Sequence, residues 1–297
     1  MIYNINSKDD IASISSLFSF NNKLILIIRE AGLNIVKHTK GGKFIFYSLE
    51  DKYRLIFDDI SNAFDIKKAF IKGFSSSKTL GIGLNLLINI VDNMEIIPKK
   101  NGTTFIFEVY KKQKKEYCLF HKKFKKLEAF LKTNPFLSIT TSGDCGVFEK
   151  INKKYLFALW DIEGHGSKEV YLASKKLKKF ILAFKHFDLK ESIDVINYLF
   201  YGSKKASMII GEIKENIFLY QFGNVKFLHN NFISQSTKGI FGMSILEKKE
   251  YILDINDIAI FSDGIKIDTI PSSYEELSQM LKNKDLDDAS ILSIKVK

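Results

Sequence analysis

Apolar residues recur with two different spacings along this 297-residue chain. In residues 23–40 they fall on one broad helical face and two glycines follow, which predicts a helix that ends there. Residues 44–49 and 53–57 have the patterns of paired strands, and Asn101-Gly102 is typical of a hairpin turn. The first third of the chain therefore predicts a mixture of helices and hairpins.

A new run of predicted strands begins after residue 115. The apolar run 155–160 predicts a buried strand, and residues 167–184 carry apolar side chains at helical spacing. Between them lies Asp161-Ile162-Glu163-Gly164-His165-Gly166, whose glycines let the backbone turn. A carboxylate thus stands at a strand end before a helix. Taken alone, such an Asp also fits a turn residue or a helix cap.

Composition narrows the classes of function. A hydrophobic fraction of 45% is sufficient for packed cores, and the net charge of +11 is spread over both halves. The most basic stretch, residues 111–126, fits a solvated linker and strand edge better than an electrostatic patch for an acidic protein or nucleic acid. Asp9 and Asp10 interrupt the segment where a secretion signal needs apolar residues, and no apolar run reaches ~18 residues. We expect a cytoplasmic protein with no membrane span and no nucleic-acid partner.

Several polar residues of the first third suit a nucleotide. Glu30 and Asn34 stand four residues apart and share a helix face. An Asn amide oxygen can ligate Mg²⁺, and a Glu can deprotonate an attacking hydroxyl or water. Asp58, at a predicted strand end, could accept a hydrogen bond from the exocyclic amine of adenine. Each residue alone also fits a surface Glu, a helix-face Asn or a capping Asp.

Glycines complete this set. Gly81 and Gly83 precede a predicted helix, and backbone N–H groups at a helix start suit a triphosphate. Gly102-Thr103 follows at the hairpin. In this order the residues resemble the GHKL ATPase superfamily with its Bergerat ATP-binding fold. They are most similar to the switch-protein serine kinases, which are RsbT-like and anti-sigma-factor-like.

That resemblance implies a role for each residue. The segment Glu30-Ala31-Gly32-Leu33-Asn34 is similar to the N-box, which implies Glu30 as catalytic base and Asn34 as a Mg²⁺ ligand. Asp58 matches the adenine-binding Asp, although the sequence departs from the family at Ile60, where glycine is usual. The remaining matches are to the ATP-lid and the closing Gly-Thr element, and they imply ATP contacts by Gly81, Gly83 and Thr103.

Carboxylates also stand at predicted strand boundaries in the second part of the chain. They are Asp144, Asp161, Asp263 and Asp287. Without clusters of His or Cys, such carboxylates suit hard ions such as Mg²⁺ or Mn²⁺. Two such ions can activate a water and clamp a phosphoryl group, so no Ser or Cys nucleophile is needed.

The order of these motifs resembles the PPM-type serine/threonine phosphatases, in particular the SpoIIE-like and RsbX-like branch. The resemblance implies that Asp161 bridges two metal ions and that Ile162 offers its backbone carbonyl. It also implies that Asp263 and Asp287 complete the metal shell, with Asp288 as the fallback for Asp287. Asp144 matches the Ser-Gly-Asp carboxylate of the same metal site.

Together the two resemblances predict an α+β protein of two domains. Residues 1–115 would form a two-layer α/β sandwich of the Bergerat type, and residues 116–297 a four-layer αββα sandwich. The implied function is a phosphoserine/phosphothreonine phosphatase with two Mn²⁺ or Mg²⁺ ions, fused to a kinase-like domain that binds ATP with Mg²⁺.

The resemblances also imply the setting, a bacterial partner-switching pathway. Implied partners are a phosphorylated STAS-type switch or scaffold protein and a sigma factor, and a homodimer is left open. In the alternative, the N-terminal domain is not catalytic and sequesters a sigma factor or switch protein. The chain would then be a phosphatase only, or a pure binding regulator.

Overall fold

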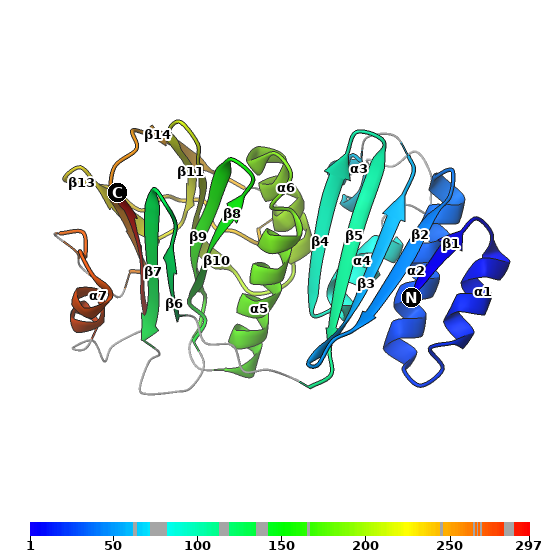
Figure 1. The fold of residues 1–297 in the computed structure, drawn as a ribbon. Helices are drawn as coiled ribbons and strands as arrows, with labels where there is room; N and C mark the ends of the chain where they lie inside the picture. Colours follow the sequence, from blue (N-terminus) through cyan, green and yellow to red (C-terminus); the bar gives the residue numbers. More distant parts are fainter. Residues whose placement is uncertain are drawn as a thin grey trace. The chain divides into compact units, whose positions relative to one another are not determined.

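The computed structural model describes residues 1–61, 64–71, 82–112, 119–134, 142–164, 167–243, 246–263, 265, 267, 269–281 and 288–297. The chain divides into two compact units. Unit 1 comprises Met1–Lys115 together with Lys179–Leu199, and unit 2 comprises Glu116–Lys178 and Phe200–Lys297. Each unit is built on its own β-sheets (Figure 1). No helix in the described ranges is long and apolar enough to cross a membrane.

Unit 1 is organised around a five-stranded antiparallel sheet with the strand order β1-β2-β3-β5-β4. Its strands are β1 (Ile2–Ile5), β2 (Gly42–Ser48), β3 (Lys52–Asp59), β4 (Asn93–Lys99) and β5 (Gly102–Tyr110). Within the described part of residues 1–115, the helices are α1 (Lys8–Ser16), α2 (Asn22–His38), α3 (Ile66–Phe70) and α4 (Ile82–Ile90).

Helix α2 confirms the first predicted helix. The side chain of Asn21 caps it by accepting hydrogen bonds from two backbone N–H groups of the first turn. The apolar face of α2 is buried, and the sheet buries a row of rings across three strands. In this row the ring centroids of Phe44 and Phe57 are 4.9 Å apart, and those of Phe57 and Phe107 are 5.8 Å apart. This apolar layer is the core of unit 1.

The segment Lys179–Leu199 also belongs to unit 1, although residues 116–178, which precede it in the sequence, belong to unit 2. It consists of the end of α5 (Lys168–Ala183) and most of α6 (Leu189–Phe200). Two of its residues bind one carboxylate on β4. Lys185 Nζ lies 2.9 Å and His186 Nε2 lies 2.6 Å from Glu95 Oε1.

Because Glu95 is held by Lys185 and His186, we expect unit 1 to lose stability in acid. The hydrogen bond from His186, followed by that from Lys185, lowers the pKa of Glu95 to about 2, although burial acts in the opposite direction. The ordinary value lies near 4.5, so ionised Glu95 stabilises the folded state fully above about pH 4.5. This contribution is lost as the pH falls toward 2. After allowance for solvent screening, we expect the ionised Glu95 to contribute about 1–2 kcal/mol to the free energy of unfolding.

The measurement is hydrogen exchange of the β4 amides in the full chain and in Glu95→Gln. Their protection should differ at pH 6 and converge as the pH approaches the folded pKa. A difference that stays constant from neutral pH down to about 2 would show that ionisation of Glu95 contributes nothing.

Unit 2 contains two stacked sheets with the strand orders β14-β11-β10-β9-β8 and β13-β12-β15-β16-β7-β6. The first sheet consists of β8 (Cys145–Ile151), β9 (Lys154–Ile162), β10 (Ala206–Ile213), β11 (Ile217–Phe222) and β14 (Lys249–Leu253). The second consists of β6 (Leu119–Lys123), β7 (Leu127–Asn134), β12 (Lys226–His229), β13 (Phe232–Ile233), β15 (Ile258–Phe261) and β16 (Ala289–Val296).

The core of unit 2 joins both sheets. Phe157 and Ile209 of the first sheet share one buried cluster with Leu131, Ile260 and Leu292 of the second. A second cluster packs α7 (Tyr274–Met280) against the second sheet. The α+β class predicted from the sequence is confirmed.

The strand-turn-helix predicted around Asp161 is present as β9 and α5. Trp160 at the end of β9 is fully buried, and its Nε1–H donates to Ser174 Oγ on α5 at 2.8 Å. This buried hydrogen bond holds the first half of α5 against β9. It lies next to Asp161 and Ile162, the last two residues of β9, which pair with Ser207 and Ala206 of β10.

Candidate functional site

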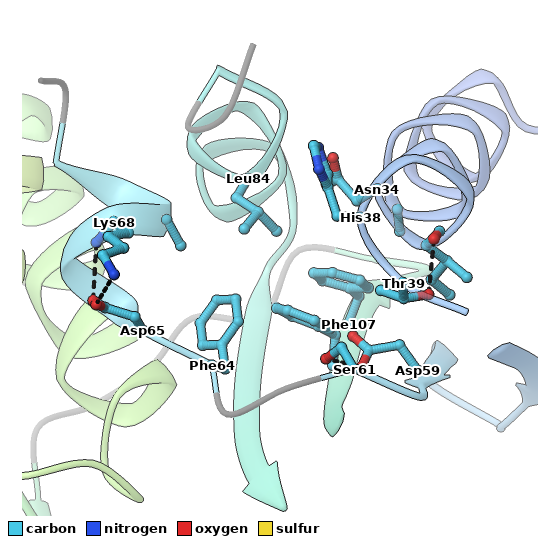
Figure 2. A pocket seen from close by; sticks show the side chains of 14 residues that line it. Asn34, His38, Thr39, Asp59, Ser61, Phe64, Asp65, Lys68, Leu84 and Phe107 are labelled. Carbon is cyan, nitrogen blue, oxygen red and sulfur yellow. Dashed lines mark hydrogen bonds and ion pairs between the residues drawn. The ribbon is translucent and has the colours of Figure 1, made fainter. Parts of the chain in front are cut away.

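Unit 1 contains a cavity of about 270 Å³, and Asn34 is the residue predicted for nucleotide that lines it among the described residues. Helix α2 forms one side of this cavity and α3 forms the opposite side (Figure 2). Apolar side chains of α4 and β5, among them Leu84, Phe105 and Phe107, line much of the remainder. A mostly apolar cavity with a few convergent polar groups is typical of a small-molecule site.

The structure places Asp59 at this cavity and places Asp58 elsewhere, which corrects the sequence prediction. Asp59 is buried, and its Oδ1 accepts hydrogen bonds from Thr103 N–H at 3.0 Å and Ser61 Oγ at 2.8 Å. Burial raises the pKa of Asp59 above its ordinary value, while these hydrogen bonds act against burial. Asp58 instead pairs with Lys99 and accepts from Thr104 Oγ1 at 2.7 Å.

Glu30, Asn34 and Gly83 come together as predicted, from α2 and α4. A Cβ atom added to Gly83 would stand 2.9 Å from Glu30 Oε2 and 3.7 Å from Asn34 Oδ1. Asn34 lines the cavity, and its buried Nδ2 has no hydrogen-bond partner among the described residues. Only glycine leaves the space beside both side chains open, and a buried amide without a partner suits a ligand. Gly81 lies outside the described residues.

Thr103 is fully buried next to Asp59. Its N–H is used by Asp59, but its Oγ1 has no partner in the described part of the chain. The preceding Gly102 has φ +131°, and a Cβ atom there would stand 2.1 Å from the carbonyl oxygen of Asp59. The turn therefore needs glycine, because a side chain would push β5 away from the end of β3.

The structure adds His38 to the predicted set. His38 lines the cavity four residues after Asn34, on the same face of α2. Burial, followed by the charge of Lys37, lowers the pKa of His38, which favours the neutral imidazole. The i, i+4 spacing with Asn34 was the available sequence signal. Ile60, where the family has glycine, is not among the described residues with positive φ, so its backbone does not need glycine.

The second candidate site is a group of carboxylates in unit 2. Asp144, directly before β8, is completely buried, and neither carboxylate oxygen has a hydrogen-bond partner among the described residues. Burial raises the pKa of Asp144 well above its ordinary value, and the neighbouring charge of Asp161 raises it further. A buried, uncompensated carboxylate is costly unless it takes up a proton or a cation.

Asp288 binds the turn that precedes Asp144 through hydrogen bonds. Its Oδ2 accepts hydrogen bonds from Gly143 N–H at 3.0 Å and Ser142 Oγ at 2.8 Å. A Cβ atom on Gly143 would stand 2.5 Å from Val170 Cγ1 and 3.1 Å from the carbonyl oxygen of Ile162. Asp288 thus fixes the Ser-Gly-Asp turn against the end of β9.

The remaining predicted ligands are only partly described. Asp263 is exposed, with Asn224 Nδ2 at 3.5 Å from its Oδ2, and Asp287 lies outside the described residues. Within the described ranges no three His, Cys, Asp or Glu residues form a ready metal site. Asp144, Asp161 and the Ile162 carbonyl are oxygen donors of the type that Mg²⁺ and Mn²⁺ prefer. The unpartnered oxygens of Asp144 fit a divalent cation at this position.

Comparisons with known proteins gave structural matches only. No protein-family model and no curated protein matches the chain. A crystal structure of RsbX in complex with magnesium matches with a TM-score of 0.54 and 16% identity. The match covers 60% of this chain, in its C-terminal part, and 100% of RsbX.

Two further structures match less well. One belongs to work on the bacterial stressosome as a modular system adapted to control secondary messenger signalling. It has a TM-score of 0.49 and 20% identity, and covers 58% of this chain and 100% of that one. The other is the serine/threonine phosphatase Stp1 from Staphylococcus aureus, with a TM-score of 0.48 and 14% identity. It covers 63% of this chain and 99% of Stp1. The match to RsbX alone shows that the C-terminal part of the chain has the RsbX fold.

Proposed function

We propose that unit 2 is a metal-dependent protein phosphatase that removes phosphate from phosphoserine or phosphothreonine. One observation carries this proposal. A completely buried Asp144 with two unpartnered oxygens stands beside Asp161, at strand ends of a fold that RsbX shares. The RsbX structure contains magnesium, which supports a divalent cation at the equivalent edge of this chain.

In this proposal, some residues of unit 2 bind the metal ions and others position those ligands. Asp161, Asp144 and the Ile162 carbonyl would hold two Mn²⁺ or Mg²⁺ ions, with Asp263 and Asp287 completing the shell. When bound, such ions supply Lewis acidity toward a phosphoryl group and lower the pKa of water. Asp288 positions Asp144 through the Ser142-Gly143 turn. Trp160 and Ser174 keep β9 and α5 rigid behind Asp161.

For unit 1 we propose a nucleotide site of the Bergerat type. Asp59 would accept a hydrogen bond from the exocyclic amine of adenine, and Thr103 Oγ1 supplies a further buried polar group. Asn34 would ligate Mg²⁺ of ATP, with Glu30 beside it as base. Gly83 leaves open the space next to both residues for phosphate. Such a unit would act as a kinase on a switch protein.

The proposed setting is a partner-switching pathway, with a phosphorylated STAS-type switch or scaffold protein as substrate. A second candidate is an N-terminal unit that sequesters a sigma factor or switch protein without phosphorylating it. Ile60, which is 58% exposed next to the cavity residue Asp59, favours this candidate because an exposed apolar side chain suits a protein contact.

Removal of the metal tests the phosphatase proposal. The full chain should release phosphate from a phosphoserine peptide in Mn²⁺, and chelation should lower the rate by roughly 10³-fold or more. Re-addition of Mn²⁺ should restore the rate. Hydrolysis that is unaffected by chelation, or no hydrolysis of phosphoserine and phosphothreonine peptides at any Mn²⁺ concentration, would overturn the proposal.

A further inference from the structure

A hollow of about 260 Å³ lies in unit 2, next to the start of β14. It is lined by residues 236–239 of one loop and by residues 247–249, which lead into β14. The charged residues that line it are Lys238, Lys248, Lys249 and Glu247. With three lysines against one glutamate, this lysine hollow is positively charged.

Two of these lysines are not neutralised by neighbouring carboxylates. Within the described ranges, neither Lys238 nor Lys249 forms an ion pair. Lys249 Nζ lies 5.1 Å from the centroid of the Tyr251 ring, and Lys248 Nζ lies 5.2 Å from that of Tyr220. An aromatic face attracts an ammonium group without cancelling its charge. The lysine hollow can therefore attract an anionic group.

The walls of the lysine hollow are held in fixed positions. A Cβ atom added to Gly239 would overlap the carbonyl oxygen of Glu247, so the two walls touch through their backbones. Thr237 binds the first wall to Gly223. Its N–H donates to the Gly223 carbonyl oxygen at 2.9 Å, and its Oγ1 accepts from the Gly223 N–H at 2.8 Å. The hollow is thus attached to the turn 223–225, which follows β11.

A buried amide side chain ties the same turn to β14. Gln221 of β11 is fully buried. Its Nε2 donates to the carbonyl oxygens of Val225 at 2.8 Å and Gln235 at 3.0 Å, and its Oε1 accepts from the Tyr251 hydroxyl at 3.1 Å. A buried polar network whose members all have partners favours one arrangement. The loop, the turn and β14 therefore form one rigid frame around the hollow.

The turn 223–225 also contacts the carboxylates proposed to bind metal. The backbone N–H of Asn224 donates to Ser207 Oγ at 3.1 Å, and Ser207 pairs with Asp161 between β10 and β9. Asn224 Nδ2 lies 3.5 Å from Asp263 Oδ2. The lysine hollow and the proposed metal site are therefore attached to the same turn.

The sheet sets the distance between the lysine hollow and Asp161. Strand β14 lies three strands from β9 in the order β14-β11-β10-β9. With about 4.8 Å between neighbouring strands, the hollow lies roughly 15 Å from Asp161. An extended peptide spans this distance in about four residues.

We propose that the lysine hollow is a docking subsite for acidic side chains of the phosphoprotein substrate, about four residues from the phosphoserine or phosphothreonine. This inference rests on the proposed phosphatase function and adds the class of sequence that the enzyme prefers. Carboxylates of the substrate pair with Lys238 and Lys249 while its phosphoryl group lies at Asp161. Because the hollow is remote from the reacting phosphorus, its contacts are equal in the ground and transition states. They lower KM and leave kcat unchanged.

Matched phosphoserine peptides test the subsite in the full chain with Mn²⁺. One set carries Glu about three to five positions before or after the phosphoserine, and the other carries Gln at the same positions. A Glu peptide should have a kcat/KM about 3- to 10-fold above that of its Gln counterpart, the range expected for one or two exposed ion pairs. The difference should lie in KM. It should shrink as salt is raised to about 0.5 M, because exposed charges are screened.

The double variant Lys238→Met with Lys249→Met should remove this preference, so that Glu and Gln peptides have equal kcat/KM. Lys150→Met is the matched control. Lys150 Nζ also lies over an aromatic ring, 6.0 Å from the centroid of Tyr155. Lys150 stands beside the turn between β8 and β9, at the end of β9 opposite to Asp161. Its variant should keep the wild-type preference.

Equal kcat/KM values for the Glu and Gln peptides in the wild type would overturn the docking subsite while the proposed phosphatase stands. A preference that survives in the double variant would show that acidic side chains bind elsewhere, and would overturn the subsite in the same way. If none of the phosphopeptides is hydrolysed, the subsite and the proposed phosphatase are both wrong.

Discussion

Asp161→Asn should lower Mn²⁺-dependent hydrolysis of a phosphoserine peptide by roughly 10³-fold or more. The carboxylate of Asp161 is the proposed bridge between two ions, and each tenfold loss of rate corresponds to about 1.4 kcal/mol of lost transition-state stabilisation. Asn has the same shape but no charge, so the fold is retained while the ions lose their shared anionic ligand. The measurement is kcat under saturating Mn²⁺ in the full chain.

The matched control is Asp254→Asn, an exposed carboxylate of the same unit. It should hydrolyse the peptide at the wild-type rate. Circular dichroism of both variants should match that of the wild type. If Asp161→Asn keeps the wild-type kcat in excess Mn²⁺, the assignment of Asp161 to the metal site is wrong.

Asp59→Asn should weaken ATP binding by roughly 10- to 100-fold, the loss expected for a hydrogen bond to a charged group in a buried site. The Asn carbonyl oxygen can still accept the Thr103 N–H, so the junction of β3 and β5 is retained. The Asn amide hydrogens would face the amine hydrogens of adenine, and two donors repel each other.

The neighbouring residue provides the control for this prediction. Asp58→Asn should change ATP affinity less than about twofold, because its side chain is directed toward Lys99 and Thr104. A large loss in Asp58→Asn with none in Asp59→Asn would support the assignment made from the sequence, and would show that the cavity is not the adenine site.

The difference between the predicted Asp58 and the cavity-lining Asp59 has a simple physical origin. Neighbouring residues of a strand point to opposite faces, so a one-residue difference moves a carboxylate from one face to the other. The sequence Asp58-Asp59 does not show where the strand ends, whereas burial of Asp59 and its bond to Thr103 in the structure do. The sequence placed the candidate adenine carboxylate one residue before the carboxylate that lines the cavity, and only the packed sheet distinguishes the two.

Helical spacing predicted more reliably than the strand pattern which side chains lie close together. Glu30 and Asn34 were placed on one face of a helix by their i, i+4 separation, and the structure brings both beside Gly83. The same rule applied once more would have found His38. Such local periodicity is readable because the helix geometry alone fixes which side chains are neighbours.

Contacts between residues far apart in the sequence could not be predicted from local spacing. The sequence gives no sign that Lys179–Leu199 packs in unit 1, because Glu95, Phe70 and Lys67 are about a hundred residues away along the chain. Similarly, the role of Asp288 depends on Ser142 and Gly143, which β-sheet pairing brings close. The predicted ligand Asp287 remains a prediction.

Mn²⁺ titration of the full chain tests the central claim most directly. Trp160 is the only tryptophan and directly precedes Asp161, so its fluorescence reports on this site. Equilibrium dialysis of the same samples counts the bound ions. We predict two Mn²⁺ ions per chain at unit 2, a fluorescence change on binding, and loss of both in Asp161→Asn. Equal Mn²⁺ binding and equal fluorescence changes in wild type and Asp161→Asn would contradict a metal-dependent phosphatase centred on Asp161.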